Sequence, residues 1–165
     1  MTGRLAVLVA GSLLAGLILV SAPAQAAPTR MWADLAVSRE GRVWTEHLTR
    51  PIFATSTRWV PGDVRTRRFF ARNQSGEDAR LSVAVRVFDR TAWLSRGALR
   101  MFLRVDGRWR RITFAGRTGV GNLRVRAGEV VPVIIRIRMW PSATAVDAQR
   151  SMRFVVKLRL TEERR

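Results

Sequence analysis

The chain has 165 residues, enough for one domain and a short extension, and its 47% hydrophobic content excludes a disordered polymer. It contains no cysteine, which excludes disulfides, thiolate metal sites and a cysteine nucleophile. The 30 basic residues against 12 acidic ones give a net charge of +18, and a charge this high draws a protein to polyanions.

Residues 1–26 have the pattern of a secretory signal peptide. Arg4 supplies the positive start, residues 5–20 are apolar, and Ala24-Gln25-Ala26 has the small residues of a cleavage site. An uncleaved membrane anchor is the competing interpretation, because the apolar run approaches the length that spans a bilayer. The cleavage motif favours removal. We therefore expect residues 27–165 to form a single domain that is secreted, extracellular or cell-envelope associated, with no integral membrane span after cleavage.

After this segment the chain is expected to begin with a strand over residues 33–38. The stretch that follows carries scattered apolar residues rather than a regular pattern. A short amphipathic helix over residues 43–49 is an alternative there, and Pro51 argues against its continuation.

The central stretch predicts two strands around a polar loop. Pro61-Gly62-Asp63 has the composition of a turn, and residues 66–72 are extended in character. Residues 73–78 contain no apolar side chain, whereas from residue 81 to residue 87 Leu or Val stands at every second position, alternating with Ser82, Ala84 and Arg86. A period of two is typical of a half-buried strand. We therefore expect the two strands to form a hairpin.

A second hairpin is expected around Asp106-Gly107. In residues 99–105 apolar side chains stand at every odd position and alternate with Arg100, Phe102 and Arg104, and a further strand pattern covers residues 108–114. An Asp-Gly pair between two such runs is a strong hairpin signal, because a type I′ turn needs positive φ at both central positions.

The last third of the chain adds three expected strands, over residues 123–126, 130–139 and 151–160. The glycine-rich residues 115–121 before them read as a flexible connection. Pro132 predicts that its end of the strand lies at a sheet edge, because proline has no N–H to donate. The whole pattern predicts an all-β fold, an antiparallel immunoglobulin-like or jelly-roll-like sandwich of about seven to nine strands.

Four short motifs in this order carry a family resemblance: Gly41-Arg42-Val43-Trp44, Pro51-Ile52-Phe53, Trp59-Val60-Pro61-Gly62-Asp63 and Arg72-Asn73-Gln74-Ser75-Gly76. With the closing strand, they resemble secreted bacterial immunoglobulin-like β-sandwich modules and, more distantly, matrix proteins of the TasA/camelysin type. The resemblance covers most of the chain after residue 26 and implies a sandwich with an extracellular structural role. It does not account for the arginine excess.

No group of side chains in the sequence has the pattern of an active site. His47 is the one histidine, so a structural or surface role is expected for it. The acidic residues are scattered, apart from two adjacent pairs, and none shows calcium-loop spacing. Residues 116–121 lack the Gly-Lys-Ser/Thr of a phosphate loop. The sequence therefore predicts no enzyme, no metal and no cofactor.

The tryptophans leave one alternative open. Most of the six tryptophans lie at expected strand ends or connections: Trp32, Trp44, Trp59, Trp93, Trp109 and Trp140. Packing in the core and at its rim is the ordinary role for such residues. An exposed row of Trp93, Trp109 and Trp140 would instead present flat apolar faces to sugars. The alternative function is therefore a carbohydrate-binding or carbohydrate-active secreted protein.

The arginines fall repeatedly on strand faces opposite the expected core. If the consecutive strands over residues 130–139 and 151–160 pair antiparallel, one outer face collects the expected polyanion-binding residues Arg136, Arg138, Arg153, Lys157 and Arg159. Like charges opposed across strands are destabilising, so an anionic partner would explain their placement. The competing interpretation is a solvated face in a chain whose coding sequence favours arginine.

The sequence thus favours a secreted, non-enzymatic cell-envelope or extracellular-matrix module whose basic surface binds anionic polymers. Its expected partner is an anionic envelope polymer or an anionic lipid surface, with nucleic acid bound only non-specifically. Self-association belongs to a third hypothesis, a fibre or pilus-like subunit that assembles by strand exchange between sheet edges.

Overall fold

The structure, a computed structural model, describes residues 34–54, 56, 58–88, 94, 96–113, 117–148 and 152–162. The expected signal peptide lies outside the described residues. In this part of the chain no helix is long and apolar enough to cross a membrane.

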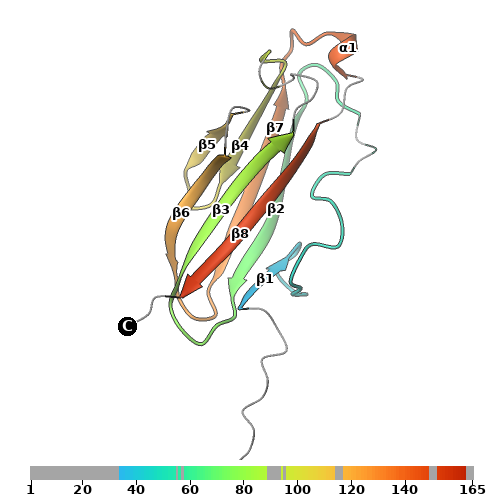
Figure 1. The fold of residues 1–165 in the computed structure, drawn as a ribbon. Helices are drawn as coiled ribbons and strands as arrows, with labels where there is room; N and C mark the ends of the chain where they lie inside the picture. Colours follow the sequence, from blue (N-terminus) through green and yellow to red (C-terminus); the bar gives the residue numbers. More distant parts are fainter. Residues whose placement is uncertain are drawn as a thin grey trace, which may run out of the picture.

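Eight strands of the described chain form two antiparallel sheets that pack against each other (Figure 1). The larger sheet has the order β1 (Leu35–Ser38), β2 (Val64–Asn73), β7 (Val130–Met139), β4 (Leu99–Arg104) and β5 (Trp109–Ile112). The smaller sheet has the order β6 (Arg117–Val125), β3 (Ala79–Phe88) and β8 (Arg153–Glu162), and the short helix α1 (Ala145–Ala148) lies between β7 and β8. The expectation of an all-β antiparallel sandwich is confirmed.

The core forms because alternate residues of the strands are apolar and face the opposite sheet. Val133, Ile135 and Ile137 of β7 are buried, as are Leu81 and Val83 of β3, and the buried residues of both sheets form one continuous cluster. Each fully buried Val, Leu or Ile side chain stabilises the fold by about 1.5–3 kcal/mol. A core of this size holds the two sheets together without a disulfide.

The expected hairpin around residues 73–78 is wrong. β2 pairs with β1 and β7, whereas β3 pairs with β6 and β8, so the loop passes from one sheet to the other. The Asn73 side chain anchors this crossing by donating hydrogen bonds to the carbonyls of Glu77 (2.8 Å) and Arg126 (3.1 Å). Both strands have an apolar face, and the two faces meet across the core instead of lying side by side.

The hairpin around Asp106-Gly107 is confirmed, since β4 and β5 pair with Arg104 opposite Trp109. Its turn is not of type I′, because among these loop residues only Gly107 has a positive φ, of 83°. Residues 105–108 form the loop, and the Asp106 carboxylate accepts hydrogen bonds from the Arg108 N–H and the Arg110 side chain. A longer loop needs fewer residues with positive φ.

The prediction of a flexible connection over residues 115–121 is wrong for residues 117–121, because β6 begins at Arg117 and runs through Gly119 and Gly121. Residues 115 and 116 lie outside the described residues. Gly119 allows a close approach to β3, since a Cβ built on it would lie 2.4 Å from the carbonyl oxygen of Val83. The register shifts between Leu81 and Val83, which marks a bulge. Glycines that predict a loop here serve close backbone packing.

Two smaller expectations concern Pro132 and residues 43–49. β7 is a central strand, yet β4 pairs with it only as far as Ile134. Pro132 therefore lies where β7 has a paired neighbour on one side alone, as its missing N–H predicts.

Residues 43–49 form no helix, and Thr45 makes an isolated antiparallel bridge with Val37.

Candidate functional site

The outer surface of the larger sheet carries seven arginines, which we call the arginine face: Arg68, Arg72, Arg100, Arg104, Arg111, Arg136 and Arg138. They occupy positions that alternate with buried residues on β2, β4, β5 and β7, so their side chains point away from the core. Because neighbouring strands lie only about 4.8 Å apart, the face concentrates positive charge in a small area.

The strand register places these arginines in rows across the sheet. One row runs from Arg138 of β7 to Arg100 of β4, which are direct partners. The next row contains Arg136, Phe102 and Arg111 on β7, β4 and β5. Along β7 the two arginines are two residues apart, which corresponds to about 7 Å on a strand.

Aromatic rings stack with the arginines of these two rows and with Arg104 of the following row. The guanidinium carbons of Arg100 and Arg138 lie 4.1 and 4.7 Å from the centre of the Trp140 ring. Those of Arg136 and Arg104 lie 4.2 and 5.1 Å from the centre of the Trp109 ring. A cation over an aromatic face is stabilised by about 0.5–2 kcal/mol, depending on its exposure. The rings thus offset part of the repulsion between neighbouring guanidinium groups.

The far end of the arginine face repeats this arrangement. The guanidinium of Arg68 lies 5.0 Å from the Phe70 ring centre, and that of Arg72 lies 5.7 Å from the Trp44 ring centre. Stacking fixes the planar group while leaving its N–H edge available for other contacts. The aromatic residues therefore hold the arginines in defined orientations.

Within the described part of the chain, the side-chain ion pairs lie off the arginine face. They join Arg65 to Asp63, Arg110 to Asp106 and Arg124 to Asp78. On the face, the Arg136 Nε donates to the Thr66 hydroxyl at 3.3 Å, while the Nε atoms of Arg72 and Arg100 are buried without a hydrogen-bond partner. Because the ion pairs of the described residues lie elsewhere, the terminal nitrogens of these guanidinium groups, rather than the buried Nε atoms, can donate to an external anion.

The residues expected to bind polyanions do not share one surface. Arg136 and Arg138 lie on the arginine face, but Arg153, Lys157 and Arg159 lie on β8 in the smaller sheet. The expected pairing of the last two strands is wrong, because β2 and β4 occupy both sides of β7. The connection that contains α1 carries the chain to the other sheet, where β8 pairs with β3.

The sequence interpretation placed four arginines of this face opposite the core but assigned polyanion binding only to Arg136 and Arg138, and it did not consider Arg68, Arg72 and Arg111. Arg100 and Arg104 stand at outward positions of an alternating strand, which the sequence does show. Their proximity to Arg136 and Arg138 depends on the order of strands in the sheet, for which the sequence carries no local signal. The tryptophans at positions 109 and 140 were visible, but not as partners of these arginines.

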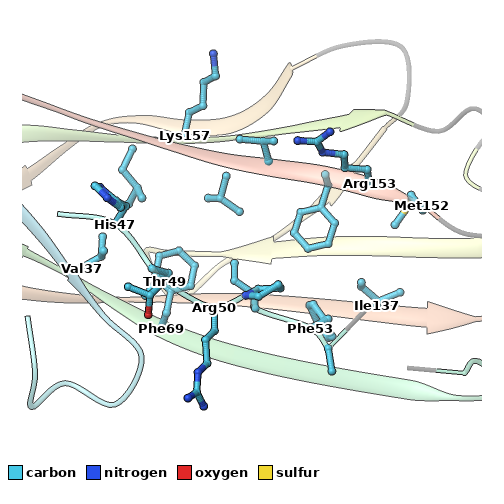
Figure 2. Close-up of a pocket in the computed structure, with 18 of the residues that line it drawn as sticks. Val37, His47, Thr49, Arg50, Phe53, Phe69, Ile137, Met152, Arg153 and Lys157 are labelled. Atoms are coloured by element: carbon cyan, nitrogen blue, oxygen red, sulfur yellow. The ribbon is translucent and has the colours of Figure 1, made fainter. Parts of the chain in front are cut away.

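A large apolar groove lies on the flank where β8 and β1 form the edges of the two sheets, with a volume of about 1140 Å³. Figure 2 shows Phe53, Phe69 and Ile137 around it, whereas the Lys157 side chain points away from it. Residues 46–54 form one wall, and the ring of Phe53 contacts those of Trp59 and Phe154, with centre distances of 6.4 and 6.1 Å.

The polar residues in the lining of the groove include Glu46, His47 and Arg50. His47 lies on its rim and is exposed, as the surface role expected for it requires. Within the same part of the chain, no three His, Asp or Glu side chains gather closely enough to hold a metal ion. Its lining is predominantly aliphatic and aromatic, which suits the binding of apolar groups.

Comparison with known proteins identifies no family for this chain. No family and no curated protein matches it. A solved structure described as AvmM, which catalyses macrocyclization in alchivemycin A biosynthesis, is similar over 64% of this chain and 83% of that one, with 12% identity and a TM-score of 0.31. A likeness this weak carries no argument about fold or function.

Proposed function

We propose that this chain is a secreted, non-enzymatic module of the cell envelope or extracellular matrix that binds anionic polymers through the arginine face. One observation carries the proposal: seven outward arginines gather on four adjacent strands, six of them stacked on aromatic rings, and the ion pairs of the described residues lie elsewhere. The secreted location rests on the sequence pattern of residues 1–26.

The chemistry of guanidinium groups favours polymers that carry phosphate, sulfate or carboxylate. A planar guanidinium donates two parallel hydrogen bonds to such groups, and these charge-assisted bonds are stronger than neutral ones. Most arginines of the face are stacked, and all stand on sheet strands, so they lose less freedom on binding than mobile side chains would. Repeated charges on a polymer would engage several rows at once.

A carbohydrate-binding role finds less support on this surface. A sugar stacks on an open aromatic face, but the rings of Trp109 and Trp140 each have two guanidinium groups over them. Trp93 lies outside the described residues. A neutral glycan would also leave the charges of the arginine face uncompensated, whereas an anionic one would neutralise them.

Binding to polymers of different charge tests the proposal. The purified protein should bind poly(glycerol phosphate) and two DNA duplexes of unrelated sequence, and it should not bind neutral dextran. Affinity should fall steeply as salt rises, because counterion release drives such binding. Equal binding of dextran, or an affinity that does not change with salt, would contradict the proposal.

A further inference from the structure

The smaller sheet ends at β8, beside the groove. It has three strands opposite the five of the larger sheet, and β8 is its edge on the side of the groove. Figure 1 shows β8 along this flank, while β5 and β6 contact each other on the opposite flank. The inner faces of β1 and β2 therefore extend beyond the smaller sheet, and the groove lies over them.

β8 is an edge strand with one paired side and with inward side chains that are incompletely buried. This strand has 10 residues, and among the described strands only β3 pairs with it. Its inward side chains Phe154, Val156 and Leu158 are only partly buried, whereas the β3 partners Val83 and Val85 are almost fully buried. Alternate N–H and C=O groups of an edge strand have no partner in the sheet, which makes such an edge a template for another chain.

The groove beside this edge suits a row of apolar side chains. Val37 and Phe69 of the larger sheet line the groove, together with residues 46–54 and with Phe154, Val156 and Leu158 of β8. The groove has a volume of about 1140 Å³ and is lined by consecutive residues 153–158 of β8, so it follows this edge. A chain paired with the edge would place every second side chain inside the groove.

We propose that the groove binds an extended peptide that pairs with β8 as a fourth strand and carries apolar residues alternating with acidic ones. Its apolar side chains would fill the groove. Its acidic side chains would lie on the outer surface beside Arg153, Lys157 and Arg159, which are exposed. Opposite charges on neighbouring strands stabilise their pairing.

Hydrogen bonding favours a peptide over an alkyl chain in this groove. A lipid tail would fill the apolar volume, but it would cover the β8 edge without offering partners to its N–H and C=O groups. Covering backbone polar groups in this way is costly. A strand both fills the groove and satisfies the edge, which is the usual basis of strand addition.

Three synthetic peptides of 10 residues, the length of β8, test the pattern. One alternates valine and glutamate, the second alternates valine and lysine, and the third has the composition of the first in two blocks. We expect the Val/Glu peptide to bind at least about tenfold more tightly than either of the others. Equal binding of the alternating and block peptides would overturn the proposal, and so would binding of dodecanoate in the groove with no binding of the peptides.

Selective N-methylation tests the backbone pairing directly. In an extended peptide the N–H groups of alternate residues point to the same edge, so methylation of all valines blocks one edge and methylation of all glutamates blocks the other. Only one edge can face β8. We expect one methylated peptide to lose at least about tenfold in affinity while the other stays within about threefold of the parent. Equal affinities of the two would contradict strand addition.

Charge reversal in the protein separates this site from the arginine face. The variant Arg153→Glu, Lys157→Glu, Arg159→Glu should prefer the Val/Lys peptide, because its outer charges are inverted. The control Arg136→Glu, Arg138→Glu changes the other sheet and should keep the preference for Val/Glu. An unchanged preference in the first variant, or a reversed one in the control, would overturn the assignment to β8.

Discussion

Arg100 and Arg138 are direct cross-strand partners on β4 and β7, and both guanidinium groups lie over the ring of Trp140. Two like charges at such positions repel each other and destabilise a sheet. The shared ring reduces this cost, because its negative face attracts both cations. The tryptophan thus allows a dense cationic surface on a stable sheet, and the same arrangement recurs around Trp109.

A double-mutant cycle between Arg100 and Trp140 measures this stabilisation. We expect Arg100→Gln and Trp140→Leu to be coupled by about 0.5–2 kcal/mol in the free energy of unfolding, measured with urea. The cycle Arg111→Gln with Trp140→Leu is a suitable control, since Arg111 belongs to β5 and the cations over this ring are those of Arg100 and Arg138. Additive effects of the Arg100 and Trp140 substitutions would show that the stacking contributes nothing.

Gly119 should tolerate no side chain, because a Cβ would meet the backbone of β3. The atom would lie 2.4 Å from the carbonyl oxygen of Val83, so the two strands would have to separate. We expect Gly119→Ala to lower the free energy of unfolding by about 1–3 kcal/mol. Gly121→Ala is the matched control on the same strand, since the nearest atom there is the Ser82 hydroxyl at 3.8 Å. Similar losses in both variants would contradict this account of Gly119.

Asn73 should be the most sensitive polar residue of the loop between the sheets. It is buried, its Nδ2 donates to the carbonyls of Glu77 and Arg126, and its Oδ1 accepts from the Ser75 hydroxyl at 2.6 Å. Asn73→Ala leaves these groups without partners and should cost about 2–3 kcal/mol by urea unfolding. Gln74→Ala, at the exposed neighbouring position, should change stability by less than about 0.5 kcal/mol. An unchanged free energy of unfolding in Asn73→Ala would disprove the anchoring role.

Two aspartates make stability depend on pH in acid. A hydrogen bond from the Arg65 side chain, with another from the Val60 N–H, holds the pKa of Asp63 below its ordinary value of 3.8. At Asp106 desolvation acts to raise the pKa, but hydrogen bonds from the Arg108 N–H and the Arg110 side chain outweigh it, and the net shift is downward.

The sign of the pH effect follows from these lowered values. A carboxyl group whose pKa is lower in the folded state stabilises the fold above its unfolded pKa, and it loses that contribution as pH falls through the folded pKa. We expect the urea midpoint to fall from roughly pH 5 downward, and the variant Asp63→Asn, Asp106→Asn to show a flatter profile. Parallel profiles of variant and parent would contradict the assignment.

The strands of this fold are largely readable from the sequence, whereas their order is not. The alternation over residues 130–139 predicts β7 with its bounds, because burial of one face imposes a period of two. The same alternation says nothing about neighbours, so β8 was expected beside β7 and lies in the other sheet. Pairing depends on contacts between distant segments that must fit around one core.

The candidate site was likewise predictable in its local features but not in the contacts between distant segments. The outward position of Arg136 and Arg138 is a local property and was predicted from alternation. Their proximity to Arg100 and Trp140 was not predicted, because it depends on the register between β4 and β7. Gly119 shows why a local signal can also mislead. Its conformational freedom favours a loop, but in the structure the missing side chain allows close packing between two strands.

Two triple variants test most directly whether the arginine face binds the polymer. The first variant combines Arg100→Gln, Arg136→Gln and Arg138→Gln on the larger sheet, and the second combines Arg153→Gln, Lys157→Gln and Arg159→Gln on the smaller sheet. Each removes three positive charges from the outer face of its sheet. Both should remain folded by thermal unfolding. The measurement is the slope of log Kobs against log salt for DNA, whose magnitude falls by about 0.9 for each phosphate that the protein no longer neutralises.

We expect the slope of the first variant to be smaller in magnitude by about two to three, and that of the second to stay within about one of the parent. Equal decreases in the two variants, or a larger decrease in the second, would show that binding follows net charge alone and would contradict the arginine face as the binding site.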